Sequence, residues 1–281
     1  MIGQISFKTC AFATPGEEAN GMLSVTDAKA VVLTRAGKTQ RFEFEHVGYA
    51  EDKDDLGALF FKTVVPMVEL CLLGFNSSLF LLSRDKQGKD ARIKERFCLE
   101  SEFGVYPTLL GHLFAELRGS GQPFSVTAKG FEVFSERIRD IASEITLSPS
   151  SSSSPSRIEP TRRGLKLQSD KLLGVCVQGL VSWRLDSVSA AMALVHALYS
   201  KRMTLFTTEG SSVASAASVG SVSHLFIRLE IEVGEIRSVC QVTDLAGSET
   251  LSFQPTEGNN IFFVARDRIA NLSDSSQENL L

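Results

Sequence analysis

Residues that form disulfides or bind structural metal ions are scarce in this sequence. Its 281 residues include five cysteines, four histidines and one tryptophan. The cysteines are odd in number and far apart, without a Cys-x-x-Cys pair, and no two histidines have the spacing that would place both on one helix face. These absences argue against a disulfide framework and against a structural metal site, and they predict a reduced, intracellular protein.

Long apolar runs and blocks of like charge are absent as well. The 29 lysines and arginines face 33 aspartates and glutamates, which gives a net charge of -4 without any basic block. This balance argues against nucleic acid as the main partner. No apolar run is long enough to cross a bilayer, and the amino end lacks the basic start and apolar stretch of a signal peptide. We therefore expect no membrane partner.

What the sequence does contain is typical of a soluble, globular α/β chain. Hydrophobic residues make up 43% of the sequence and charged residues 22%, which is enough apolar material for a large core. Strand-like and helix-like patterns alternate on both sides of a Ser/Pro-rich segment at about 146–164. That segment has too little apolar surface to order itself. We predict one domain over residues 1–281 with a disordered surface insertion there.

Apolar residues recur at helical spacing in three stretches, which predicts helices over 56–72, 107–119 and 188–202. Pro66 lies inside the first helix and predicts a kink. Asp186 is the candidate N-cap of the third helix, and Lys201 and Arg202 in its last turn suit the helix dipole.

The strand patterns predict two hairpins and one buried strand. Residues 31–44 hold two short β-type runs around a Gly-containing turn, and residues 225–242 hold two more around Gly234-Glu235. The apolar run at 79–82 predicts a central strand covered on both faces. Asp244 follows the second strand of the hairpin at 225–242, a position where nucleotide-binding folds place a metal-facing carboxylate.

The six residues from Asp244 to Glu249, Asp-Leu-Ala-Gly-Ser-Glu, are identical to the switch II signature of the kinesin motor domain family. Further segments resemble that family in the same order along the chain: 74–80, 104–107 with Leu113-Phe114, 132–140 and 174–180. The resemblance runs from about Phe42 to Glu249. It implies the P-loop NTPase fold of kinesin motors, an α/β fold with a mixed, mostly antiparallel central sheet and helices on both faces.

The same resemblance implies a cofactor, a partner and a location. It implies ATP or ADP with Mg²⁺ at one edge of the sheet, microtubules (tubulin) or another cytoskeletal protein as partner, and a place on the cytoplasmic cytoskeleton. Gly247 and Glu249 of switch II and Ser221 of switch I take the catalytic positions. Asp90, Ser221 and Asp244 take the magnesium positions.

The phosphate loop departs from the family pattern. That pattern, Gly-x4-Gly-Lys-Ser/Thr, wraps phosphates with backbone amides, neutralises them with lysine and binds magnesium through the hydroxyl. The aligned residues are Ser83, Arg84, Asp85, Lys86, Gln87, Gly88, Lys89 and Asp90. Ser83 replaces the first glycine and Asp90 replaces the hydroxyl residue. At about 4 Å and an effective dielectric near 20, the carboxylate of Asp90 repels a phosphate charge by about 4 kcal/mol, roughly a thousandfold in affinity. Gly88-Lys89 is equally well explained as a solvated turn.

Switch I and the amino end depart as well. The nearest match to the family's Ser-Ser-Arg-Ser-His is Gly220-Ser221-Val222-Ser223-His224. Val222 replaces the arginine that pairs with the switch II glutamate, here Glu249, so closure of the site lacks its charge-assisted clamp. His224 is more simply a structural histidine than a chemical group. The amino end shows no Arg-x-Arg-Pro strand, which packs against adenine in the family.

About thirty residues follow Glu249, without the long helices and neck linker of the family. We expect a fold that is incomplete at its C-terminal end, with 257–272 forming either a shortened switch II helix or an ordinary amphipathic helix. An acidic chain also gains nothing from long-range steering towards acidic tubulin.

Three functional hypotheses follow. The leading one is a kinesin-like module with little or no ATP hydrolysis that binds microtubules or another protein. Its rival is an active ATP-dependent microtubule motor that relies on Gly88, Lys89, Ser221 and the intact switch II. In the third, Ser148-Pro149 and Ser154-Pro155 are phosphorylation sites in the insertion, although a flexible spacer is the simpler explanation.

Overall fold

The structure is a computed structural model of the whole chain. It describes residues 10–13, 23–35, 37–49, 53–82, 98–99, 104–134, 136–147, 155–161, 164–170, 174–202, 204–207, 218–221 and 223–246.

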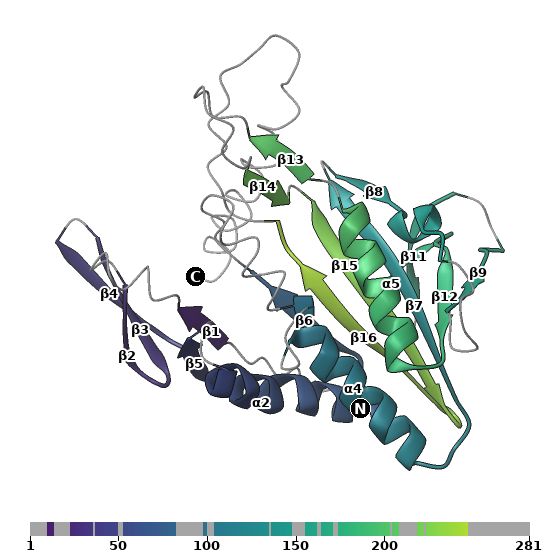
Figure 1. Ribbon diagram of the computed structural model, residues 1–281, viewed down its shortest axis with the longest axis horizontal. Coiled ribbons are helices and arrows are strands. Elements are labelled where there is room, and N and C mark those ends of the chain that lie inside the picture. Colours follow the sequence, from purple (N-terminus) through teal and green to yellow (C-terminus); the bar gives the residue numbers. More distant parts are fainter. Residues whose placement is uncertain are drawn as a thin grey trace, which may run out of the picture.

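A mixed β-sheet forms the centre of the molecule (Figure 1). Its strands follow the order β6 (Ser77–Leu81), β16 (Ile236–Asp244), β15 (His224–Val233), β7 (Phe124–Phe134), β12 (Ser182–Leu185) and β9 (Ser156–Ile158), and β8 (Arg137–Arg139) pairs with β7. Among the described strands of this sheet, β6 and β16 pair in parallel and the other neighbouring pairs are antiparallel. The predicted mostly antiparallel central sheet is confirmed, and so is the hairpin of β15 and β16.

Within the residues that the structure describes, three α-helices pack against the sheet, as their apolar spacing predicts. They are α2 (Lys53–Leu72), α4 (Val105–Gly119) and α5 (Val188–Lys201). Their buried side chains share one apolar core with the face of β15 that carries Leu225, Ile227 and Leu229. The N-cap of α5 is Ser187 rather than Asp186, because the Ser187 hydroxyl accepts a bond of 3.1 Å from the backbone N–H of Ala190. The helix expected within 257–272 lies outside the described residues.

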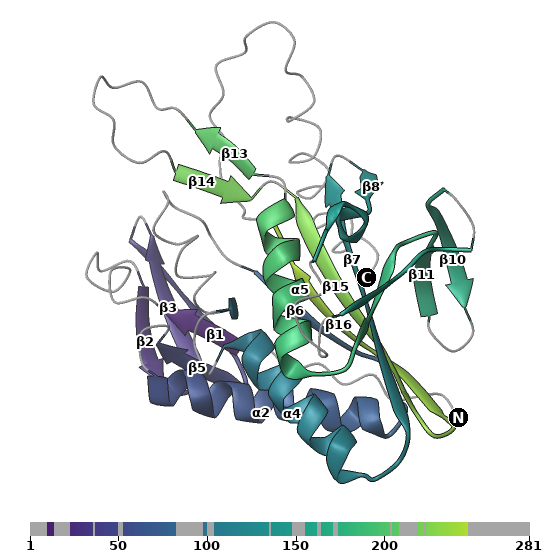
Figure 2. The same ribbon diagram turned by 45° about the vertical axis from the view of Figure 1, so that its right-hand side comes forward.

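Smaller sheets surround this core (Figure 2). The hairpin predicted over 31–44 is present as β3 (Ala30–Arg35) and β4 (Lys38–Glu43), and β2 (Leu23–Asp27) adds a third strand. The remaining two-stranded sheets are β1 (Cys10–Ala13) with β5 (His46–Tyr49), β10 (Lys166–Asp170) with β11 (Gly174–Gln178), and β13 (Thr204–Thr207) with β14 (Ser218–Ser221). Within the described chain, no helix is long and apolar enough to span a membrane.

The position expected for strand β6 is wrong. The apolar run at 79–82 predicted a central strand covered on both faces, but β6 is the edge strand of the sheet formed by the described residues. Its burial alternates along the strand, and the side chains of Phe80 and Leu82 are 55% and 77% exposed. A short apolar run looks the same whether one face or two are covered, so the sequence did not distinguish these cases.

The expectation that the whole Ser/Pro-rich insertion is disordered is also wrong. Residues 156–158, predicted to be disordered, form strand β9 and pair antiparallel with β12. Residues 148–154 and 162–163 of the insertion lie outside the described part of the chain.

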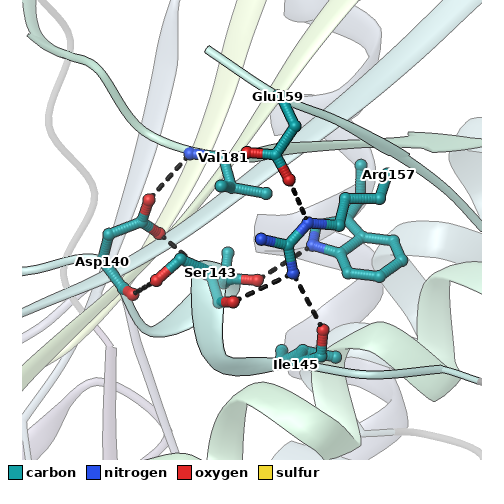
Figure 3. Close-up of polar contacts among 8 residues, drawn as sticks. Asp140, Ser143, Ile145, Arg157, Glu159 and Val181 are labelled. Carbon is teal, nitrogen blue, oxygen red and sulfur yellow. Dashed lines mark hydrogen bonds and ion pairs between the residues drawn. The ribbon is translucent and has the colours of Figure 1, made fainter. Parts of the chain in front are cut away.

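Arg157 anchors β9 to the body of the protein (Figure 3). Its guanidinium donates to the backbone carbonyls of Ser143 at 2.9 Å and Ile145 at 3.2 Å, and its Nε lies 2.6 Å from Glu159 Oε1. The guanidinium carbon is also 6.0 Å from the centre of the Trp183 ring, within the range of a cation–π contact. The order of β9 therefore comes from its pairing with β12 and from the tertiary contacts of Arg157 rather than from local composition.

The carbonyls that Arg157 reaches are themselves held in place. They belong to or follow the 3-10 helix η2 (Ile141–Glu144), whose N-cap Asp140 accepts bonds from the backbone N–H groups of Ser143 at 3.2 Å and Val181 at 2.7 Å. Burial raises the pKa of the Asp140 carboxyl above its usual value, while these N–H donors act in the opposite direction. Asp140 thus fixes η2 to the start of β12.

Gly130 lets helix α5 approach the sheet closely. A Cβ added at this position of β7 would lie 2.2 Å from Cδ2 of Leu198, which is completely buried in the core. We expect Gly130→Ala to lower the free energy of unfolding by about 1–3 kcal/mol, because the overpacked core must shift. Chemical denaturation measures this change.

Gly111 in α4 provides the control. A Cβ there would meet nothing within 4 Å, so Gly111→Ala should raise the stability by up to about 1 kcal/mol through helix propensity. A Gly130→Ala protein as stable as the wild type would contradict the proposed close contact.

Candidate functional site

The structure describes two of the predicted site residues, Asp244 and Ser221. Asp244 is the last residue of β16, and Ser221 is the last residue of β14, where it pairs with Thr204. Of the three predicted magnesium ligands, the two that the structure describes therefore belong to different sheets. The phosphate-loop residues 83–90 and the switch II residues Gly247 and Glu249 lie outside the described residues.

The carboxylate of Asp244 is buried and held by two donors from α5. The residue is 1% exposed. Its Oδ2 lies 2.7 Å from Nη1 of Arg202, which is the C-cap residue of α5, and accepts a bond of 3.2 Å from the hydroxyl of Tyr199. Tyr199 and Arg202 are three residues apart, so both reach the same oxygen from the last turn of one helix.

Arg202 also bridges the ends of two strands. Its Nη2 donates to the backbone carbonyl of Ser223, just before β15, at 2.6 Å and to the backbone carbonyl of Asp244, at the end of β16, at 2.9 Å. The Arg202 side chain is only 5% exposed. A buried guanidinium that compensates a carboxylate and two carbonyls ties helix α5 to both strand ends.

A second ion pair, buried on its carboxylate side, adjoins the first through Ser223. Glu132 of β7 is completely buried, and its Oε1 lies 2.7 Å from Nε of Arg139 in β8. Its Oε2 accepts a bond of 2.7 Å from the hydroxyl of Ser223. Ser223 therefore contacts both networks, through its hydroxyl to Glu132 and through its carbonyl to Arg202.

His224 links the strand that follows switch I to the start of switch II. Its Nδ1 accepts a bond of 3.0 Å from the backbone N–H of Ala246. An accepting Nδ1 places the proton of the neutral ring on Nε2. This contact gives His224 a structural role, in agreement with the interpretation of the sequence.

Two tyrosines complete the buried cluster around Asp244. The rings of Tyr106 and Tyr199 meet edge to face with centroids 5.9 Å apart. Burial raises the pKa of Tyr199 well above its usual value, and the nearby Tyr106 adds to the shift. Burial likewise raises the pKa of Tyr106, with Cys98 as the next contributor. Both phenols therefore stay protonated near neutral pH, and Tyr199 remains a hydrogen-bond donor to Asp244.

Sequence reasoning found Asp244 but missed the groups that surround it. The sequence interpretation assigned Arg202 only to the helix dipole, whereas its main contacts are Asp244 and Ser223. Tyr199 counted only as part of an apolar stripe. The sequence did contain a signal for this contact. An arginine at the end of a helix and an aspartate at the end of a buried strand both carry charges that need a partner when they are buried. The amino-terminal strand β1 was also missed; its four residues, Cys-Ala-Phe-Ala, contain no arginine.

Comparison with known proteins gives these observations a family. A family model of the kinesin motor domain matches residues 13–263. The kinesin-like protein KIP2 of Saccharomyces cerevisiae is 27% identical over 262 residues, covering 88% of this chain and 35% of KIP2. The kinesin-like protein KIN-5C of Arabidopsis thaliana is 30% identical over 215 residues, covering 72% of this chain and 20% of KIN-5C. The chain thus spans about a third or less of the length of these relatives.

The fold agrees with the sequence match. The solved structure of KIF14[391-755] with ADP in complex with a microtubule superposes with a TM-score of 0.68 at 17% identity, covering 98% of this chain and 81% of that chain. The family match extends over most of the sequence and includes both the central sheet and the buried cluster at Asp244. The chain belongs to the kinesin motor domain family.

Proposed function

We propose that this chain is a kinesin-fold module that associates with microtubules and hydrolyses ATP very slowly or not at all. The kinesin family match and the microtubule-bound KIF14 neighbour support the partner. The substitutions in the nucleotide site support the loss of turnover. The single-domain organisation expected from the sequence remains part of this proposal.

The sequence departures each remove one function of the site. Asp90 places a negative charge where the family has the magnesium-binding hydroxyl, and Ser83 replaces a glycine of the phosphate loop. Val222 removes the guanidinium partner of Glu249. Strand β1 has the sequence Cys-Ala-Phe-Ala, so it lacks the arginines of the family's amino-terminal strand.

The observation that carries the proposal is the environment of Asp244. This carboxylate is 1% exposed, and the Arg202 guanidinium balances its charge at 2.7 Å. Tyr199 donates to the same oxygen. A carboxylate with these donors is already compensated inside the fold, so it fits a structural role better than a role in holding magnesium-bound water.

Microtubule-stimulated phosphate release from the purified chain tests the proposal. We expect the rate to stay near the level without microtubules, while cosedimentation detects binding to microtubules in the presence and absence of nucleotide. Stimulated turnover at ordinary motor rates, or a lack of cosedimentation under any nucleotide condition, would refute it.

The active-motor alternative makes the opposite prediction. It requires magnesium-dependent ATP binding in the micromolar range that disappears in Lys89→Ala, because this lysine is the remaining cation of the phosphate-loop pattern. Lys86→Ala is the matched control, since it removes the same charge from a variable position of that loop. Equal nucleotide binding by the wild type and both variants would count against the alternative.

A further inference from the structure

Two buried cysteines meet where helix α2 packs against strand β16. Cys71 lies in the last turn of α2, and Cys240 lies in the middle of β16. Both are free thiols in the same apolar core. The Cys71 thiol donates to the backbone carbonyl of Val239, the residue before Cys240, at 3.5 Å. The two thiols also lie within hydrogen-bond reach of each other.

Ser77 completes this thiol cluster. It is the first residue of β6 and pairs with Cys240 across the sheet. The hydrogen bond with Cys240, followed by those with the side chain and backbone of Ser77, lowers the pKa of the Cys71 thiol against the opposing effect of burial. The hydrogen bond with Cys71, together with burial, raises the pKa of Cys240 well above its usual value. The thiolate, which is the reactive form of cysteine, therefore forms more readily on Cys71.

We propose that Cys71 and Cys240 are a redox-sensitive thiol pair, which hydrogen peroxide oxidises to a disulfide that ties the end of α2 to the centre of the sheet. This inference does not rest on the proposed function. The thiols are the resting state, and the disulfide is the oxidised state of the same fold.

The oxidation takes two steps. The Cys71 thiolate first attacks one oxygen of the peroxide, so that the O–O bond breaks and Cys71 sulfenic acid and hydroxide form. The hydroxide takes up the proton that Cys71 released. The Cys240 sulfur then attacks the Cys71 sulfur, the S–O bond breaks, and the oxygen leaves as water with the Cys240 proton. Two thiols lose two electrons and two protons in total, and one peroxide becomes two water molecules.

The position of Cys71 suits a small oxidant. Leu70 and Leu73, on either side of it in the sequence, are 44% and 69% exposed. The buried sulfur thus belongs to the last turn of a helix whose neighbouring side chains face solvent. Opening of this turn alone would expose Cys71, because helix ends open more easily than the centre of a sheet.

Peptide mapping of the folded full chain after treatment with hydrogen peroxide tests the proposal. Mass spectrometry without reduction should find the Cys71 and Cys240 peptides linked and two hydrogens lighter than their sum, with two of the five thiols lost. The link closes a long loop, so the midpoint of guanidinium denaturation should rise by about 0.5–1 M. Dithiothreitol should reverse both changes. Five remaining thiols, or links between other cysteines in the folded protein, would refute the proposal.

Single substitutions test the order of the two steps. In Cys240→Ser, the Cys71 sulfenic acid has lost its thiol partner and should proceed to sulfinic acid, seen as two added oxygens. In Cys71→Ser, Cys240 should stay reduced, since its raised pKa disfavours the thiolate. Oxidation of Cys240 in Cys71→Ser as fast as in the wild type would contradict the role of Cys71 as the first thiol to react.

Cys176→Ser is the matched control. Cys176 is a partly exposed cysteine of the separate hairpin formed by β10 and β11. This variant should link Cys71 to Cys240 as the wild type does, and a missing link in a folded Cys176→Ser protein would contradict the assigned pair. The wild-type peptide map decides the proposal even if a variant at a buried position fails to fold.

Discussion

Arg202→Met is expected to lower the free energy of unfolding by about 3–5 kcal/mol, because it leaves the carboxylate of Asp244 buried without its charge partner. The Arg202 side chain is 5% exposed, and methionine keeps much of its apolar length while losing all three charge-assisted contacts to Asp244 and Ser223. A loss of this size is a large part of the stability of a typical domain. Guanidinium denaturation with unchanged m-value measures it.

An exposed ion pair at the opposite end of the same hairpin provides the control. Arg237 and Glu232 face each other across β15 and β16 at 3.2 Å, with side chains 63% and 50% exposed. Arg237→Met should cost at most about 1 kcal/mol, since solvent screens such a pair. Asp244→Asn combined with Arg202→Met should recover part of the loss, because the orphaned charge is gone. Equal losses for Arg202→Met and Arg237→Met would contradict a buried charge pair at Asp244.

Asp90→Thr is expected to tighten the binding of magnesium nucleotide by between about tenfold and a thousandfold. The upper limit corresponds to about 4 kcal/mol of repulsion between a carboxylate and a phosphate charge 4 Å apart at an effective dielectric near 20. Partial compensation by the metal and by Lys89 lowers the gain. Threonine also restores the hydroxyl that the phosphate-loop pattern uses for magnesium. Titration with a fluorescent ADP analogue, with and without Mg²⁺, measures the effect.

Asp85→Thr is the control that distinguishes a local effect at the magnesium position from a general effect of net charge. Asp85→Thr removes the same charge from a variable position of the same loop segment, so its effect on affinity should be several-fold at most once 0.15 M salt screens the more distant charge. If the two variants gained affinity equally, or if neither gained, the assignment of Asp90 to the magnesium position would be wrong.

The elements of the fold followed well from periodicity. Apolar spacing located α2, α4 and α5. The alternation of charged and apolar residues located β15, and the turn at Gly234-Glu235 located β16 as its partner. The failures came from information that local patterns lack. Ser187 and Asp186 are adjacent residues that both make good N-caps, and only the geometry of the helix start selects between them. The ordering of β9 depends on Arg157 finding Trp183 and the carbonyls at 143–145, contacts that composition does not encode.

The candidate site was predicted in part. The switch II signature pointed to Asp244, because that string of residues is specific to the family. Its partners Arg202 and Tyr199 lie more than forty residues before it in the sequence. Glu132, which joins the same network through Ser223, lies earlier still. Sequence alone showed that these side chains were polar or aromatic and placed on regular elements. It did not show that the fold would gather them into one buried network, since that depends on the packing of α5 against β7 and β15.

The bonds from Arg157 to the carbonyls of Ser143 and Ile145 hold the two ends of the serine-rich segment beside each other. The entropy of closing a loop grows only with the logarithm of its length, so a segment anchored at both ends tolerates large changes between the anchors. A fluorescent or affinity reporter encoded within 148–154 should therefore leave β9 docked. Such an internal fusion would label the protein without a tag at either end of the sequence.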